Sequence, residues 1–325
     1  MFNRKNWFII ILILLVLGAI IYFSLGSVKK DKKENLLRIV YKPNANYLIY
    51  FVARENGYFK EEELEIEEIE MASTNLMVEA LLTGRADFNP SNSVPALYAA
   101  EQNAPGTFLF LYITLMEKGR TNNAIIVKKN SNFNSLFDLQ GKTIASPPGA
   151  TPVILLNLIF KDVFNIDNAF TVQELEPRIQ LQALDSEKVD AVFAIEPLIT
   201  YGETKGISRI LEADVMENHI MNPIPIAGGV ITTNFAKNNP KTAEKLYKVM
   251  NKAIDFIRSN EKEAKLIMAK AIEMPEGTAM QLGINTYWKL DEVNYNYVQQ
   301  LSDIFFEKKA LEKQVDTKMM YWKSK

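Results

Sequence analysis

A nine-residue pattern in the first half of this chain recurs in related form in the second half. Residues 80–88 read Ala-Leu-Leu-Thr-Gly-Arg-Ala-Asp-Phe and residues 183–191 read Ala-Leu-Asp-Ser-Glu-Lys-Val-Asp-Ala. Short apolar runs that end in a proline-containing loop precede the two copies, at 37–43 and 142–147. Two related α/β units predict two lobes that face each other, with a ligand cleft outside the carboxyl ends of their strands. The alternative is chance recurrence, because Leu, Gly and Asp are common residues.

The composition limits the chemistry that this chain can perform. A chain of 325 residues with 48% hydrophobic residues is long enough for two domains with sizeable cores. Its formal net charge of −2 gives no reason to expect a nucleic-acid partner. The absence of cysteine excludes disulfides, thiolate metal sites and a cysteine nucleophile, and the single histidine, His219, argues against a histidine cluster or triad. We therefore expect no catalytic residue, no metal and no cofactor.

The first 35 residues differ in character from the rest of the chain. A basic start at residues 1–5 precedes Trp7–Leu25, an apolar run about as long as a ~30 Å hydrocarbon core requires. Ser24 and Gly26 allow a cleaved signal peptide, but the run exceeds a usual signal core and a charged spacer follows it. We predict a retained single-span anchor in the cell membrane with the folded body outside the cytoplasm. The positive-inside rule disagrees, because four lysines follow the span and fewer basic residues precede it.

Hydrophobic periodicity and turn residues locate the elements of each unit. Helices are predicted at 47–55, where Gly57 supplies a left-handed stop, and at 75–82. Thr151-Pro152 is typical of a capping threonine followed by proline in the first helical turn. The chain from Asn239 onward is predicted to be helical. Strands are predicted at 36–41, 86–88, 107–116, 124–128, 141–146, 189–195 and 227–232.

Several motifs resemble one family of transport proteins. The chain contains Gly-Tyr-Phe-Lys-Glu-Glu-Glu-Leu at 57–64, a Leu-x-x-Gly-x-x-Asp pattern at 81–87 and an Asp-Ala…Glu-Pro pattern at 190–197. Together with residues 41–47 they resemble the extracytoplasmic solute-binding proteins of ABC importers for nitrate, alkanesulfonates, taurine and thiamine pyrimidine precursors. The resemblance extends from about Leu36 to near the C-terminus.

This resemblance implies an α/β, two-lobe periplasmic-binding-protein type II (Venus-flytrap) fold behind an N-terminal transmembrane segment. We expect residues 1–35 to form the anchor and spacer, 36–116 and 226–325 to form lobe 1, and 117–225 to form lobe 2. The expected partners are a small-molecule ligand, an ABC permease with its ATPase, and the membrane through Trp7–Leu25; the protein is expected to be a monomer. An enzyme of pyrimidine synthesis is disfavoured because the family's enzyme carries a Cys-rich motif, and a membrane-held sensor is a third possibility.

Ten residues at predicted strand ends and helix starts are candidate ligand contacts. Helix starts at Ser73-Thr74 and near Thr151 would direct backbone N–H groups at an anion or a polar ring atom, unless these residues only cap their helices. Glu196 follows an apolar run and is poorly hydrated unless it meets a ligand amine or ring N–H, or accepts backbone hydrogen bonds. Ser93 is its counterpart in the repeat. The set is Tyr41, Asn44, Asn46, Tyr47, Ser73, Thr74, Ser93, Gly149, Thr151 and Glu196.

Within the family, Pro43-Asn44 resembles the thiamine-precursor branch. That branch has an aromatic residue two positions before the proline and a histidine three positions after the asparagine, where this chain has Tyr41 and Tyr47. We predict a thiamine pyrimidine precursor or a similar heterocycle as ligand, because two tyrosines and the Glu196 carboxylate suit a planar or amine-bearing ring. The alternative is an anion such as an alkanesulfonate, taurine or nitrate, although no arginine clamp is evident.

Overall fold

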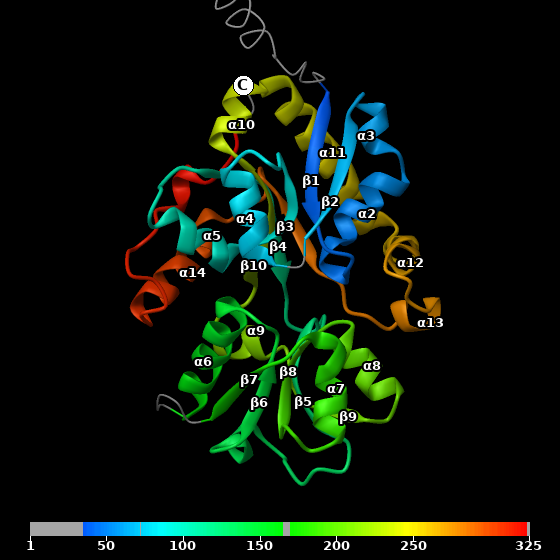
Figure 1. Ribbon diagram of the computed structural model, residues 1–325, viewed down its shortest axis with the longest axis vertical. Helices are drawn as coiled ribbons and strands as arrows, with labels where there is room; N and C mark the ends of the chain where they lie inside the picture. The colour runs from blue at the N-terminus through cyan, green and yellow to red at the C-terminus, as the bar shows by residue number, and fades with distance from the viewer. Residues whose placement is uncertain (1–34, 72, 165–169, 324–325) are drawn as a thin grey trace, which may run out of the picture. The chain divides into compact units, whose positions relative to one another are not determined.

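The computed structural model describes residues 35–71, 73–164 and 170–323 (Figure 1). The strands are β1 (Leu36–Tyr41), β2 (Glu65–Glu70), β3 (Asn89–Ser93), β4 (Phe108–Met116), β5 (Asn123–Lys128), β6 (Thr143–Ser146), β7 (Thr171–Glu174), β8 (Ala191–Ile195), β9 (Ser208–Ala213), β10 (Ile224–Thr232) and β11 (Thr286–Lys289). They form three sheets, in the orders β1-β2, β11-β4-β10-β3 and β7-β6-β8-β5-β9.

The four-stranded sheet is built on its two longest strands, β4 and β10. β4 is apolar apart from Thr114 and is buried along almost its whole length, as expected of a strand covered on both faces. β10 lies antiparallel to β4 on one side and to β3 on the other, and β11 pairs antiparallel with the second edge of β4. The two-stranded sheet adjoins β3 through a parallel bridge between Ile39 and Phe88.

The five-stranded sheet is formed by one continuous stretch of chain, from β5 to β9. β6 is parallel to β7 and β8, whereas β5 is antiparallel to β8 and β9. Residues 117–122 lead from β4 into this sheet, and residues 214–223 lead from it back to β10. The chain therefore crosses twice between the two larger sheets. The lobe boundaries after residue 116 and before residue 226 stay predictions.

Each larger sheet has its own set of helices (Figure 1). The five-stranded sheet carries α6 (Ala150–Phe164), α7 (Pro177–Asp185), α8 (Leu198–Thr204) and α9 (Val215–His219). The remaining helices accompany the other strands: α2 (Leu48–Glu55), α3 (Tyr58–Glu61), α4 (Thr74–Leu82), α5 (Val94–Glu101), α10 (Thr233–Asn238), α11 (Pro240–Ser259), α12 (Glu261–Ala271), α13 (Glu276–Ala279) and α14 (Tyr295–Glu307). Short 3₁₀ turns are η1 (Ala45–Tyr47), η2 (Leu136–Leu139) and η3 (Thr317–Met319).

The sequence of α11 explains how these helices attach to the core. Its buried residues include Leu246, Val249, Met250, Ala253 and Ile257, which recur at intervals of three and four and so share one face. This face packs against α2, whose central residues are also buried. The opposite face of α11 is rich in lysine.

The repeated segment makes the same hydrogen bonds in both places. In the first copy the Asp87 N–H donates to the Arg38 carbonyl at 2.9 Å, and the Arg38 N–H donates to Asp87 Oδ2 at 3.0 Å. In the second copy Asp190 and Thr143 exchange the two equivalent bonds, both at 2.8 Å. Each aspartate thus ties the turn after a helix to a neighbouring strand, which gives the repeat a structural basis.

The structure confirms most of the predicted strands and corrects three elements. The strand predicted at 86–88 is instead β3, because the pairing edge of β10 begins beyond Phe88, which makes only a single bridge. α6 begins at Ala150, after Gly149 at φ +117°, so Thr151 lies inside the first turn and is not its cap. β11 interrupts the region predicted to be helical after Asn239, since the open edge of β4 supplies its hydrogen bonds.

The predicted anchor, Trp7–Leu25, lies outside the described residues. Within the described ranges, no helix combines the length and the apolar character needed to cross a membrane. The anchor therefore stays a prediction from the sequence.

Candidate functional site

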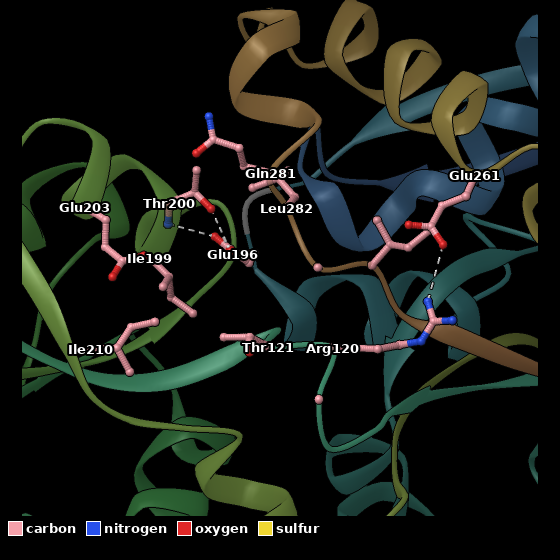
Figure 2. A pocket seen from close by; sticks show the side chains of 13 residues that line it. Arg120, Thr121, Glu196, Ile199, Thr200, Glu203, Ile210, Glu261, Gln281 and Leu282 are labelled. Carbon is pink, nitrogen blue, oxygen red and sulfur yellow. Dashed lines mark hydrogen bonds and ion pairs between the residues drawn. The ribbon is translucent and has the colours of Figure 1, made fainter.

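A pocket of about 660 Å³ opens where the first crossing segment meets α8 and the loop after α13 (Figure 2). The close approach of that loop depends on Gly283, because a Cβ atom there would lie 1.7 Å from the Arg120 carbonyl oxygen. Both larger sheets contribute to the walls through their helices and connections. The lining residues are Gly119, Arg120, Thr121, Glu196, Ile199, Thr200, Glu203, Ile210, Glu261, Gln281, Leu282, Gly283 and Ile284.

Charged groups stand on opposite sides of this pocket. Figure 2 shows Glu196 hydrogen-bonded to Thr200 on one side and Arg120 paired with Glu261 on the other. The Arg120–Glu261 distance is 3.6 Å, and Arg120 also lies 3.9 Å from Glu117. Because the guanidinium already faces two carboxylates, it offers little uncompensated charge to an anion.

Glu196 is the predicted contact that lines this pocket. It is 9% exposed, and burial raises the pKa of its carboxyl group, while hydrogen bonds from Thr200 act in the opposite direction. Thr200 donates its Oγ1–H to Glu196 Oε1 at 2.8 Å and its N–H to Oε2 at 3.1 Å. These bonds hold the carboxylate against the first turn of α8. The other nine predicted residues are not among those that line the pocket.

Gly149 and Thr151 lie at the carboxyl end of β6, where α6 begins. The Gly149 N–H donates to Glu174 Oε2 at 2.7 Å. This carboxylate, at the end of β7, therefore already accepts the hydrogen bond that Gly149 could offer a ligand. Thr151 is partly exposed within the first turn of α6.

Ser73, Thr74 and Ser93 lie at helix starts beside the four-stranded sheet. Ser73 precedes α4, but its side chain makes no capping hydrogen bond, and Thr74 is the first residue of that helix. Ser93 ends β3 and accepts a hydrogen bond from the Ala96 N–H at 3.5 Å, which caps α5. Glu196 directly follows β8, so Ser93 and Glu196 both occupy strand ends, as the repeat predicts.

The tyrosines and asparagines after β1 take different positions. Tyr47 is 3% exposed, and its hydroxyl lies 3.4 Å from Asn89 Oδ1; burial raises the pKa of this phenol. Tyr41 is half-buried and packs edge-on against Tyr47, with ring centroids 6.3 Å apart. Asn44 caps η1 by accepting from the Asn46 N–H at 3.1 Å. The structure therefore directs Tyr47 into the core, whereas Asn44 and Asn46 are partly exposed in the loop after β1.

Lys42 is a charged residue of this loop that the sequence analysis missed. It directly follows β1 and is half-buried; burial lowers the pKa of its ammonium group, and the Glu176 carboxylate, at the start of α7, partly offsets this effect. Among the described residues, no hydrogen bond or ion pair engages the ammonium. By contrast Arg54, on α2, pairs with Glu55 and Glu68. The available signal was the position of Lys42 between Tyr41 and Pro43, immediately after a strand.

Comparisons with known proteins agree on the fold. The structure of the periplasmic aliphatic sulphonate binding protein SsuA from Escherichia coli has a TM-score of 0.72 at 19% identity, covering 90% of this chain and 93% of that one. The alkanesulfonate-binding protein SsuA from Xanthomonas axonopodis pv. citri, bound to MOPS, also has a TM-score of 0.72, at 17% identity, covering 89% of this chain and 98% of that one. The α/β fold is therefore that of periplasmic binding proteins.

The sequence comparisons identify the family. A proposed aliphatic sulfonates-binding protein of Bacillus subtilis (strain 168) is 24% identical over 317 residues, covering 94% of this chain and 92% of that protein. Residues 44–264 match the family model described as NMT1/THI5 like. Because this match covers more than half of the chain, the chain belongs to the NMT1/THI5-like family.

Proposed function

We propose that this protein is the substrate-binding component of an ABC importer and captures a small organosulfonate between two lobes built on the larger sheets. Membership of the family, together with relatives named for aliphatic sulfonates, supports this choice. The same relatives favour the sulfonate alternative over the heterocycle that the Tyr41–Tyr47 loop suggested. A permease and its ATPase are the partners that this role requires.

The main structural support for an anionic ligand is the Lys42 ammonium. A sulfonate is a compact anion whose oxygens accept charged hydrogen bonds, and Lys42 is a half-buried cation without an ion-pair partner among the described residues. Because burial removes water from the Lys42 ammonium and disfavours its isolated charge, pairing with an anionic ligand is favoured. Glu176, whose charge acts on Lys42, belongs to the other sheet's helices, so a sulfonate held by Lys42 would lie where the two lobes meet.

Calorimetry on the purified full chain in detergent tests this proposal. Ethanesulfonate and taurine are expected to bind, and Lys42→Gln is expected to weaken binding about tenfold or more, as for the loss of a charged hydrogen bond. Lys60→Gln, at an exposed lysine of α3, is the matched control and should leave affinity unchanged.

Other ligands give the contrary outcomes. If no sulfonate bound, and a thiamine pyrimidine precursor bound less tightly to Glu196→Gln than to the parent, the ligand would be a heterocycle instead. If the protein bound nitrate more tightly than every sulfonate, its ligands would be inorganic anions and not organosulfonates. Conversion of a bound ligand to product would show an enzyme instead of a transport protein.

The membrane arrangement forms part of the proposal. Trp7–Leu25 is a retained anchor that holds a monomeric body outside the cytoplasmic membrane, because its apolar run matches a bilayer core and a charged spacer follows. A mature protein that begins at Ser27 would show cleavage. Protection of the body from added protease in intact cells would show the opposite orientation.

A further inference from the structure

A lysine-bordered groove lies on the side of the four-stranded sheet formed by α10, α11 and the C-terminal residues. It encloses about 860 Å³ and has an apolar floor that includes Leu109, Tyr321 and Trp322. Glu244 is the acidic residue that lines it. We call its basic border the lysine face: Lys237, Lys241, Lys245, Lys248, Lys318 and Lys323.

Helical spacing gathers these lysines on one surface. Lys241, Lys245 and Lys248 are four and three residues apart on α11, so they share the face opposite its buried stripe. Lys245 pairs with Glu63 at 3.1 Å. Within the described ranges, the other five lysines have no carboxylate within ion-pair distance. The face therefore carries an excess of positive charge.

An exposed apolar side chain stands beside this charge. Met319 is 52% exposed, whereas the neighbouring Trp322 is 8% exposed and packs at a tilt against Tyr247 with ring centroids 4.9 Å apart. No unpartnered polar side chain lies among the described residues of the floor apart from the buried Tyr321 hydroxyl. The groove is thus suited to an extended anionic surface and lacks the convergent donors of a small-anion site.

The lysine face lies near the start of β1, the first strand of the described residues. The Met71 N–H bonds to the Tyr41 carbonyl, so β1 and β2 end together and their starts lie together as well. Glu63, two residues before β2, bonds to Lys245 of the lysine face. Only residues 26–35 separate the predicted anchor from β1, and ten residues span at most about 35 Å.

We propose that the lysine face rests on the anionic surface of a lipid bilayer, with Met319 at the headgroup level. Clustered lysines attract acidic headgroups, and the effect falls off within a Debye length, so a short tether is needed to bring the face into range. The linker adds four further lysines between residues 29 and 33. The inference rests on the proposed anchoring and is independent of which ligand the cleft takes.

A single label on the full chain tests the contact. Because the chain has no cysteine, Met319→Cys gives a unique attachment point for a spin label. The labelled protein is inserted in nanodiscs of phosphatidylcholine alone or with phosphatidylglycerol. Accessibility of the label to an aqueous relaxant is expected to fall at least threefold in the anionic discs only. A label at Phe137→Cys, 64% exposed beside the five-stranded sheet, should not change.

Reversing the charge of lysines in the lysine face provides a second test of the membrane contact. The triple variant Lys237→Glu, Lys241→Glu and Lys248→Glu should abolish the protection, whereas reversal of the exposed Lys129, Lys188 and Lys205 should preserve it. Equal accessibility in both lipids, or protection that survives reversal of the lysine face, would overturn the proposal. Protection that needs the permease in either lipid would assign the face to an acidic protein instead. Failure of the chain to enter discs would count against the anchor on which the proposal depends.

Discussion

Gly84 and Glu187 occupy the same turn in the two copies of the repeat but bear different conformational costs. Each turns the chain after a helix, and each donates its N–H to a carbonyl three residues earlier, at 3.2 Å and 3.1 Å. Their φ angles are 68° and 58°. Glycine adopts this region freely, whereas a residue with a Cβ atom is disfavoured by roughly 1–2 kcal/mol. Glu187 also bonds to Lys128 at 2.7 Å, but an exposed pair of this kind contributes little.

Exchange of these residues should therefore have opposite effects on stability. Glu187→Gly is expected to raise the free energy of unfolding by about 0.5–1 kcal/mol, and Gly84→Glu to lower it by about 1 kcal/mol or more. Denaturant titration of both variants measures the difference. Glu187→Ala is the control, since it removes the ion pair and keeps the disfavoured φ. A loss in Glu187→Gly as large as in Glu187→Ala would show that the ion pair outweighs the strain.

Sequence reasoning selected residues of the loop after β1 without information on which of their side chains are buried. It identified the loop after β1 as a site region, yet it chose Tyr47, which points into the core, and passed over Lys42. Rotamer direction and partner choice depend on residues far along the chain, such as Asn89 beneath Tyr47. Such long-range contacts leave no local pattern in the sequence.

At the scale of elements, strands made of apolar runs could be predicted from the sequence. Strands that form only because a neighbouring strand pairs with them could not. β4 is apolar at nearly every position, so its location follows from the sequence alone. β3 reads Asn-Pro-Ser-Asn-Ser and is a strand because β10 pairs with it; Asn92 stands opposite Gly228. A Cβ atom at Gly228 would come within 2.7 Å of the Phe110 ring, so β10 needs glycine at this position to pack closely against that ring.

The two crossing segments are tied together by a buried polar cluster. The Gly119 N–H donates to Asp214 Oδ2 at 2.7 Å, and Asn123 Nδ2 donates to Glu217 Oε2 at 2.7 Å. Asn123 Oδ1 also accepts from the Met216 N–H at 3.0 Å. Glu217 is 5% exposed, so its charge is poorly solvated in the folded protein.

This cluster predicts a pH-dependent contribution to stability. Burial raises the pKa of the Glu217 carboxyl, hydrogen bonds from Asn123 and the backbone act against it, and the Asp214 charge adds to the increase. A raised carboxyl pKa stabilises the fold below the unfolded-state pKa, and this stabilisation is lost as pH rises through the folded-state pKa. Glu217→Gln should therefore gain thermal stability relative to the parent as the pH rises above about 4, the pKa of an unfolded glutamate.

Melting temperatures of parent and variant across that range provide the measurement. Glu101 and Glu196, whose pKa values burial also raises, are present in both proteins and cancel in the difference. A constant difference at every pH would contradict the assignment to Glu217.

At the scale of the whole chain, the arrangement suits a molecule that closes on its ligand. Two connections join the larger sheets, and few residues need change conformation for one sheet to rotate against the other. The pocket draws its walls from helices and loops of both sides. A ligand that contacts both sides favours the closed state by its difference in affinity for the two states.

Paired spin labels on the full chain should detect this closure directly. Leu76 and Ile179 are each the third residue of a helix, α4 and α7, that starts after a strand end, and they are 48% and 40% exposed. With labels at Leu76→Cys and Ile179→Cys, saturating taurine or ethanesulfonate is expected to shift the distance distribution to shorter values. A pair at Phe137→Cys and Ile179→Cys, both beside the five-stranded sheet, should stay unchanged. Calorimetric binding without any shift in the first pair would mean that capture requires no movement of one sheet against the other, and the two-lobe closure would have to be abandoned.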